Sequence, residues 1–199
     1  MTVASKHNRL FKSGFFQIEC DTGQLLPLVR DLKPSLESGR YGSDLTQSFP
    51  LDPETQPETV IGIKDARIHD FFRGIAEQAE LGVFSSRHII LHRYHKSKSM
   101  NWHHDVFDRS LILALAYLGD TCFTEDDGGV LEIAKCSVNA QGLPIGEPDI
   151  IHRVLPNPNT VVLINNTDPT ILHRVTPMLT SKIRTVLSCQ LGYAEIMIR

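Results

Sequence analysis

The stretch that decides the fold is RHIILHRYHKSKSMNWHHDVFDRSLILALAYLGD, residues 87–120. It contains two runs rich in β-branched and other apolar residues, near His88–Tyr94 and Ser110–Leu118, and a polar segment lies between them. Short apolar runs bounded by turn-forming residues are typical of β-strands in a packed core. The stretch therefore predicts a β-rich fold, and it also carries an Asn-Trp-His-His-Asp motif at residues 101–105.

The same pattern continues toward the C-terminus, where Gly, Pro, Asn and Asp separate further apolar runs. Beyond the two runs above, we expect strands near Trp102–Asp105, Gly129–Ala134, Ile150–Leu155, Thr160–Ile164, Ile171–Val175 and Ile183–Tyr193. Eight short strands without alternating helices favour an antiparallel sandwich over a parallel sheet. We therefore predict a mainly β fold, a double-stranded β-helix or jelly roll over residues 83–199, with α-helices N-terminal to it.

The region before residue 83 is predicted to be mainly helical. Apolar residues of a first helical segment recur at three- and four-residue steps, at Leu25, Leu26, Val29, Leu32 and Leu36. Pro27 suits only the first turn of such a helix, and Pro34 should end or kink it. A second helix is expected to begin after Asp65 as its N-cap and to end before Gly82. Its apolar face consists of Ile68, Phe71, Phe72, Ile75 and Ala79.

The chain is expected to form a single domain, residues 1–199, because this length buries one substantial core. Residues 1–82 would support the core and supply a candidate lid, since a polar, turn-rich loop from about Tyr41 to Glu58 separates the two helices. That loop, the N-terminal helices and the segment Cys136–Asp149 could all border the opening of a site, because jelly rolls commonly carry binding loops at their ends.

Composition excludes several functional classes. Hydrophobic residues make up 41% and charged residues 22% of the 199 residues, as in ordinary globular proteins. The formal net charge of −3 gives no basic stripe for nucleic acid. The longest apolar stretch, Leu111–Leu118, is far too short to span a membrane, and no export signal is recognised. Four scattered cysteines without a CxxC pair suit reduced thiols, so we expect a cytoplasmic protein.

The motif at 101–105 suggests a metal site. Side chains alternate along an extended strand, so His103 and Asp105 share one face while His104 points away. His173 lies in a strand-like context farther along, where a sandwich could bring it beside the pair. Two imidazoles and one carboxylate on one face of an octahedral ion leave positions open, as in non-haem Fe(II) oxygenases.

Other interpretations remain open at this stage. An isolated His-x-Asp pair is more often a set of surface or core residues than a metal site. Other histidines of the β region receive structural or surface roles by default: His88, His92, His95 and His152. A cupin is the nearest alternative metal fold, but its usual His-x-His pair and Glu are not seen here at a convincing spacing.

The ordered motifs resemble the prolyl 4-hydroxylase-like branch of the Fe(II)/2-oxoglutarate dioxygenases, over about residues 88–193. Tyr94, His103 and Asp105 keep the spacing of that branch's Tyr-x-x-Gly-x-x-aromatic-x-x-His-x-Asp signature, although Ser97 replaces its Gly and Met100 its aromatic residue. Two later segments match in order, Leu115-Ala116-Tyr117-Leu118-Gly119 and Asp127-Gly128-Gly129-Val130-Leu131-Glu132-Ile133.

The resemblance implies a set of site residues. His103, Asp105 and His173 would bind Fe(II). Arg184, eleven residues after His173, would pair with the distal carboxylate of 2-oxoglutarate, because a guanidinium grips a carboxylate through two charge-assisted hydrogen bonds. Tyr117 would donate its hydroxyl to the same carboxylate, and Tyr94 would face the cosubstrate. For each tyrosine the competing interpretation is core packing, and for Arg184 it is a surface cation on an edge strand. Gly128 and Gly129 are expected to form a turn.

The implied reaction consumes O2 and 2-oxoglutarate, with ascorbate as a candidate reductant, and releases succinate and CO2. Hydroxylation of a C–H bond is the default outcome, and desaturation or ring formation is the alternative. Asp105 favours oxygen transfer, because related halogenases carry a small residue there. With no recruitment domain, a small metabolite or amino acid is the preferred substrate, and a peptidyl-proline or other protein substrate is the alternative. A cupin-type metalloenzyme and a noncatalytic ligand-binding jelly roll are the competing classes, and the sequence indicates no oligomeric state.

Overall fold

The computed structural model describes residues 10, 12–33, 54–81, 84–105, 111–139 and 144–193. Its strands are β1 (Phe15–Glu19), β2 (Glu58–Val60), β3 (Phe84–Tyr94), β4 (Met100–His103), β5 (Ile112–Leu118), β6 (Leu131–Val138), β7 (Pro144–Val154), β8 (Thr160–Asn165), β9 (Ile171–Val175) and β10 (Arg184–Tyr193). They form a larger sheet of order β1-β8-β5-β10-β3-β2 and a smaller sheet of order β4-β9-β6-β7. Every pairing is antiparallel.

The two faces of the larger sheet bury different cores. On β5, Leu113, Leu115 and Tyr117 pack against residues of the smaller sheet such as Leu131 and Ile133. The intervening β5 residues pack with the helices instead. Because β5 alternates between two apolar layers, all seven of its residues are buried. The layer between the sheets is the interior of the jelly roll, and it is the layer that receives the candidate site.

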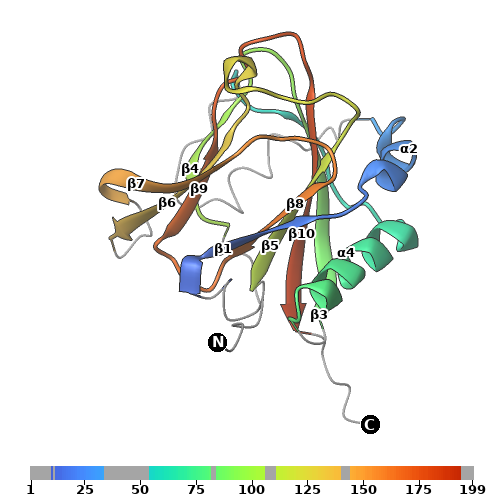
Figure 1. Cartoon of the computed structure of the whole chain (residues 1–199), viewed down its shortest axis with the longest axis horizontal. Helices are drawn as coiled ribbons and strands as arrows, with labels where there is room; N and C mark the ends of the chain where they lie inside the picture. The colour runs from blue at the N-terminus through green and yellow to red at the C-terminus, as the bar shows by residue number, and fades with distance from the viewer. Residues whose placement is uncertain are drawn as a thin grey trace.

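Helix α4 (Ala66–Gln78) covers the outer face of the larger sheet, and Figure 1 shows it with α2 (Leu26–Val29) on the side away from β6 and β7. The Asp65 side chain caps α4 by accepting a hydrogen bond from the Arg67 backbone N–H. The helix buries its apolar stripe against the sheet, with Ile68, Phe72, Ile75 and Ala76 in the core. The predicted second helix and its N-cap are thus confirmed.

The predicted jelly roll is confirmed, and each of the eight expected strands is present. Strand β9 has the predicted bounds, whereas β3, β6 and β7 are longer than predicted. Strand β4 spans Met100–His103, so it ends two residues before Asp105, which was expected to lie within it. The site below therefore combines strand residues with one residue from a strand end.

The N-terminal region contains more β-structure than predicted. Strand β1 pairs with β8 and β2 pairs with β3, so the two strands form the two edges of the larger sheet. Short edge strands carry little periodic signal, because their stability comes from the neighbouring strand rather than from their own sequence. The first helix is also shorter than predicted: a 3-10 turn at Gly23–Leu25 precedes the four-residue α2.

Several predicted features lie outside the described residues, namely Leu36, Gly82 and most of the loop from Tyr41 to Glu58.

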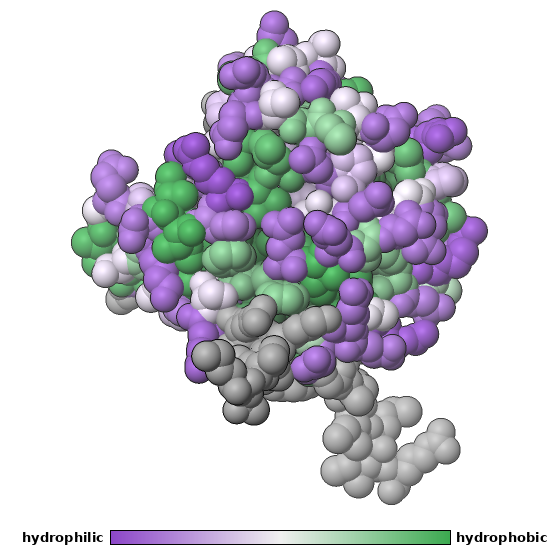
Figure 2. All heavy atoms as spheres, in the orientation of Figure 1, coloured by the Kyte–Doolittle hydropathy of each residue, from purple (hydrophilic) through white to green (hydrophobic). Residues whose placement is uncertain are grey.

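Within the part of the chain that is described, no helix is long and apolar enough to cross a membrane. Figure 2 shows a mainly hydrophilic face with apolar residues near its centre and on the side of the β6–β7 hairpin. On β7, Ile145 and Ile150 are among the exposed apolar side chains.

Candidate functional site

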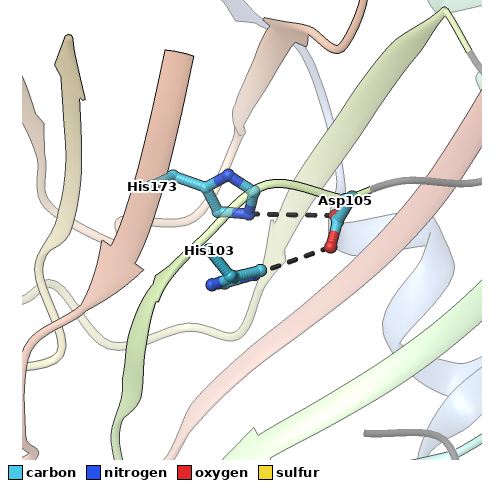
Figure 3. Close-up of side chains that lie close together, drawn as sticks. All are labelled: His103, Asp105 and His173. Atoms are coloured by element: carbon cyan, nitrogen blue, oxygen red, sulfur yellow. Dashed lines mark ion pairs between the residues drawn. The ribbon is translucent and has the colours of Figure 1, made fainter. Parts of the chain in front are cut away.

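His103, Asp105 and His173 converge at the interior layer, as predicted. His103 on β4 lies opposite His173 on β9, with ring centroids 4.1 Å apart. The Asp105 Oδ1 atom lies 3.6 Å from His103 Nε2, and Oδ2 lies 3.8 Å from His173 Nε2. Figure 3 shows both rings directed at this carboxylate. One candidate ligand atom from each residue falls within 4.8 Å of the others.

The hydrogen bond of His103 and the protonation state of His173 suit a metal site. His103 Nδ1–H donates to the Asn101 carbonyl at 2.7 Å, which leaves the Nε2 lone pair directed toward the centre of the group. Burial, with the nearby His103, holds the pKa of His173 well below its usual value, so its ring is neutral and able to bind a metal. Within the described residues, this is the one group of three or more metal-binding side chains.

His104 points away from this group, as the alternation predicts. Its Nε2–H donates to the Asn166 carbonyl at 3.2 Å, and the residue is 9% exposed. Burial lowers the pKa of this imidazole, and the nearby Asp105 partly opposes that effect. His104 is therefore a neutral hydrogen-bond donor beside the site rather than a fourth metal ligand.

Arg184, Tyr117 and Tyr94 form a second group in the interior layer. Arg184 begins β10, a central strand between β5 and β3, and is only 1% exposed, so the surface-cation interpretation is excluded. Its guanidinium carbon lies 4.5 Å from the Tyr94 ring centroid and 5.1 Å from that of Tyr117. The Nη2 atom donates to the Tyr117 hydroxyl at 3.4 Å. Among the described residues, Nε and Nη1 have no hydrogen-bond partner.

The electrostatics of this second group call for an anion. A buried cation without a counter-charge among the described residues is costly, and the unused N–H groups of the guanidinium are donors that suit a carboxylate. Burial raises the pKa of Tyr94 to about 12 and also raises that of Tyr117, with Arg184 opposing the shift in both. Both hydroxyls are therefore protonated near neutral pH, and Tyr117 can donate a hydrogen bond beside Arg184.

Gly128 and Gly129 have a more specific role than the expected turn. Gly129 has φ +66°, and a Cβ atom there would lie 2.4 Å from Met178 Sδ and 3.3 Å from Arg184 Cδ. A Cβ on Gly128 would lie 2.0 Å from the Pro177 carbonyl oxygen. The glycines let the chain pass close to the segment before β10, and so they leave room for the Arg184 side chain.

The remaining histidines of the β region lie outside the three-residue group. His95 Nε2 lies 3.2 Å from Glu58 Oε1, and His152 stacks on Phe15 with ring centroids 4.2 Å apart. His92 lies on the same face of β3 as Tyr94, with Nδ1 3.3 Å from Thr59 Oγ1. Burial, aided by Arg184, lowers the pKa of His92 to about 3. His92 therefore contributes a neutral polar group to the interior.

Sequence reasoning missed Gln190, whose Nε2 atom lies 3.4 Å from Asp105 Oδ2. A signal was present, because Gln190 lies at an even offset from Arg184 in the same strand and must share its face. Sequence reasoning also missed Glu132 on the outer face of the smaller sheet, whose side chain is only 1% exposed. Its carboxylate forms ion pairs with Arg174 Nε at 2.6 Å and with Arg153 Nη2 at 2.5 Å. Arg174 in turn stacks over Trp102, next to His103.

The residues present fit a divalent metal and a dicarboxylate. Two imidazoles and a carboxylate form the donor set that suits iron, and three ligands leave coordination positions open. The unused donors of Arg184 lie in the same interior layer, flanked by protonated tyrosines. The arrangement can thus hold a metal ion together with an anionic cosubstrate away from bulk water.

Comparison with known proteins gives a consistent result. Residues 89–192, more than half of the chain, match the family model described as the 2OG-Fe(II) oxygenase superfamily. No curated protein sequence matches the chain significantly.

Among solved structures, the chain is similar to a prolyl-4-hydroxylase from Pseudomonas putida, with 20% identity, a TM-score of 0.58, and coverage of 94% of this chain and 96% of that chain. It is also similar to a structure of HygX from Streptomyces hygroscopicus that contains nickel and 2-oxoglutarate. The identity is 16%, the TM-score is 0.60, and the match covers 98% of this chain and 88% of that chain. A Trichoplax adhaerens prolyl hydroxylase, in complex with a hypoxia inducible factor peptide fragment, has 17% identity, a TM-score of 0.57, and coverage of 93% and 86%. At these identities the likeness concerns the fold.

Proposed function

Because the chain belongs to the 2OG-Fe(II) oxygenase superfamily, with Fe(II) and 2-oxoglutarate as its cofactor and cosubstrate, we propose that His103, Asp105 and His173 bind the iron. The observation that carries this assignment is the convergence of the three ligand atoms within 4.8 Å in a buried layer. The hydrogen bond from His103 to Asn101 and the neutral state of His173 support it.

Arg184 is assigned to the distal carboxylate of 2-oxoglutarate. Its unpartnered Nη1 atom and the second N–H of Nη2 would donate to the two oxygens, and the Tyr117 hydroxyl, 3.4 Å from Nη2, would donate beside them. Tyr94 would pack its ring against the guanidinium and limit the width of the pocket. Excluding water strengthens each of these interactions.

The chemistry that the bound iron and cosubstrate supply is O2 activation, in which 2-oxoglutarate is oxidised to succinate and CO2 and the second oxygen atom hydroxylates a C–H bond. The protein's own part is to orient the ligands and to exclude water from them. His103 keeps its Nε2 lone pair available, Asp105 supplies the negative charge, and the apolar side chains of β5 and β6 close the interior.

For the substrate, we propose a small polar metabolite or amino acid. Three polar side chains line the interior face of β3 and β10 near the iron ligands, and they are His92, Ser188 and Gln190. Because the pKa of His92 is lowered to about 3, it offers hydrogen bonds without charge. Peptidyl-proline is the competing substrate, favoured by the fold shared with prolyl hydroxylases.

The metal and cosubstrate assignments are tested by anaerobic titration of the protein with Fe(II) and 2-oxoglutarate. The wild type should develop the visible absorption band of the chelated complex and should form succinate when air is admitted. His103→Ala should show neither, because it removes one of the two imidazoles of the donor set, and Asp105→Ala should lose succinate formation. His88→Ala, at an exposed position on β3, is the control and should behave as wild type. An unchanged band in His103→Ala, or unchanged succinate formation in Asp105→Ala, would refute the assignment.

The substrate class is tested by following succinate formation with amino acids, other polar metabolites and proline-containing peptides. A small molecule that stimulates succinate formation and gains one oxygen atom in the mass spectrum is the expected result. Stimulation by peptides alone would replace this proposal with the peptidyl-proline alternative.

A further inference from the structure

Two polar side chains, Gln190 and Asn166, are linked in sequence behind the Asp105 carboxylate. The Gln190 Nε2 atom lies 3.4 Å from Asp105 Oδ2, and its Oε1 atom accepts from Asn166 Nδ2 at 3.2 Å. Gln190 and Asn166 are 3% and 7% exposed, so this pair is shielded from solvent. Side chains alternate along β10, and Gln190 faces the interior while its neighbours Cys189 and Leu191 belong to the helix-side core.

The direction of these hydrogen bonds is fixed. A carboxylate can only accept, so the Gln190 amide must present its NH2 group to Asp105 and its oxygen to the other side. The Asn166 NH2 group occupies that oxygen. Asn166 thus orients the Gln190 amide, and a reversed amide would place two oxygens against each other.

The same asparagine holds the backbone next to Asp105. The Asn166 carbonyl accepts from His104 Nε2, and the Asn166 backbone N–H donates to the Leu111 carbonyl at 2.9 Å. Asn166 follows β8 in a tight turn, in which Asn165 Oδ1 accepts from the backbone and hydroxyl of Thr167 at 2.9 and 2.7 Å. Because this turn directly follows β8 of the larger sheet, it holds Asn166 in a defined position.

Such support matters because Asp105 lies beyond the end of β4. The backbones of His103 and His173 are fixed because the two residues pair across β4 and β9. Asp105 lies outside this pairing, so its carboxylate depends on side-chain hydrogen bonds for its orientation. Partners of metal ligands commonly set ligand orientation, and removing them lowers metal affinity about 10- to 100-fold.

We propose that Gln190 is a positioning residue for iron binding, which directs the Asp105 carboxylate toward His103 and His173, and that Asn166 orients Gln190. The inference rests on the proposed iron site. By occupying a lone pair of Oδ2, the Gln190 amide holds the carboxylate in one rotamer before the metal arrives. The metal then binds a preformed group of ligands rather than ordering the carboxylate itself.

The test is the Fe(II) affinity measured from the visible band of the anaerobic complex at saturating 2-oxoglutarate. Gln190→Met keeps the length of the side chain and removes the amide, and it should weaken Fe(II) binding about 10- to 100-fold. The melting temperature of the metal-free variant should stay close to that of the wild type. Cys189→Ala, at the adjacent position facing the helices, is the matched control and should bind Fe(II) within about twofold of wild type, because it does not touch Asp105.

A second variant guards against misfolding of the first. Asn166→Leu leaves Gln190 in place but unoriented, and it should weaken Fe(II) binding by less than Gln190→Met. Wild-type affinity in both variants, or an equal loss in Cys189→Ala, would overturn the role of Gln190. A wild-type protein that forms no complex would instead overturn the proposed iron site itself, so the two failures are distinguishable.

Discussion

At the scale of single residues, Arg184 is where burial and charge conflict most. The side chain is 1% exposed, stacks between two tyrosines and leaves two nitrogens without a partner in the described residues. Folding alone gives little reason to keep such a group, because an apolar residue would fill the same space without the desolvation cost. A carboxylate ligand removes that cost, so the residue is explained by binding rather than by stability.

Replacing Arg184 should therefore act on the cosubstrate requirement. Hydrogen bonds to a charged group contribute about 1.5–3 kcal/mol, so Arg184→Ala should raise the 2-oxoglutarate concentration for half-maximal succinate formation roughly 10- to 150-fold. Arg184→Lys keeps the charge but loses the planar pair of donors. Its 2-oxoglutarate requirement should lie between those of the wild type and Arg184→Ala. A requirement unchanged in Arg184→Ala would favour the cupin-type interpretation, in which no 2-oxoglutarate is used.

A side chain at Gly129 should also raise the 2-oxoglutarate requirement, by a steric effect on Arg184 rather than by a change of charge. Gly129→Ala would place a methyl group against Met178 Sδ and near Arg184 Cδ, so we expect at least a several-fold rise in the 2-oxoglutarate requirement. Gly146→Ala is the matched control, since Gly146 also has a positive φ, +84°, but has nothing within 4 Å of its Cβ position. An equal effect in both variants would show that backbone strain, not the position of Arg184, is responsible.

At the scale of elements, the site depends on how β4 meets β9. The sequence identified His103, Asp105 and His173, because alternation and motif order constrain residue identity. It did not reveal that His103 lies directly opposite His173, since the register of two strands 70 residues apart is set by packing. It also placed Asp105 within the strand, where the structure has it just after the strand end and held by Gln190.

The Asp127 carboxylate binds the segment before β10 through hydrogen bonds from Thr180 and Lys182. Asp127 accepts from Lys182 Nζ at 2.7 Å, from the Thr124 backbone at 2.9 Å and from Thr180 Oγ1 at 3.1 Å. These donors, with Lys182 contributing most, hold the pKa of Asp127 well below its usual value. The interactions tie the turn at Glu125–Asp127 to the chain that leads into Arg184.

This pKa shift predicts a pH dependence of stability. A carboxyl group whose pKa is lowered by folding stabilises the fold above its unfolded pKa, about 3.9, and loses that contribution as the pH falls toward its folded value. Asp127→Asn should therefore melt below wild type at pH 7, and the difference should shrink below about pH 4. Asp126→Asn, at the exposed neighbouring position, is the control. A difference that persists unchanged at pH 3 would contradict the ion-pair explanation.

At the scale of the whole molecule, the strand count and the absence of alternating helices were enough to predict the jelly roll. The two edge strands β1 and β2 were missed, because their pairing with β8 and β3 is a property of the assembled sheet. Gln190 and Asn166 were missed for a related reason: polar residues in apolar strands acquire meaning only when a partner is placed beside them. Similar structures at 16–20% identity share the fold, so we expect the substrate to be selected by interior side chains such as His92 rather than by the fold.

The most direct test of the central claim is a crystal structure with Mn(II), as an oxygen-stable substitute for Fe(II), and 2-oxoglutarate. We predict that the metal is bound by Nε2 of His103, Nε2 of His173 and the Asp105 carboxylate, and that the distal carboxylate of 2-oxoglutarate contacts Arg184. A metal held by other residues, or a cosubstrate carboxylate that leaves Arg184 unpaired, would contradict the account.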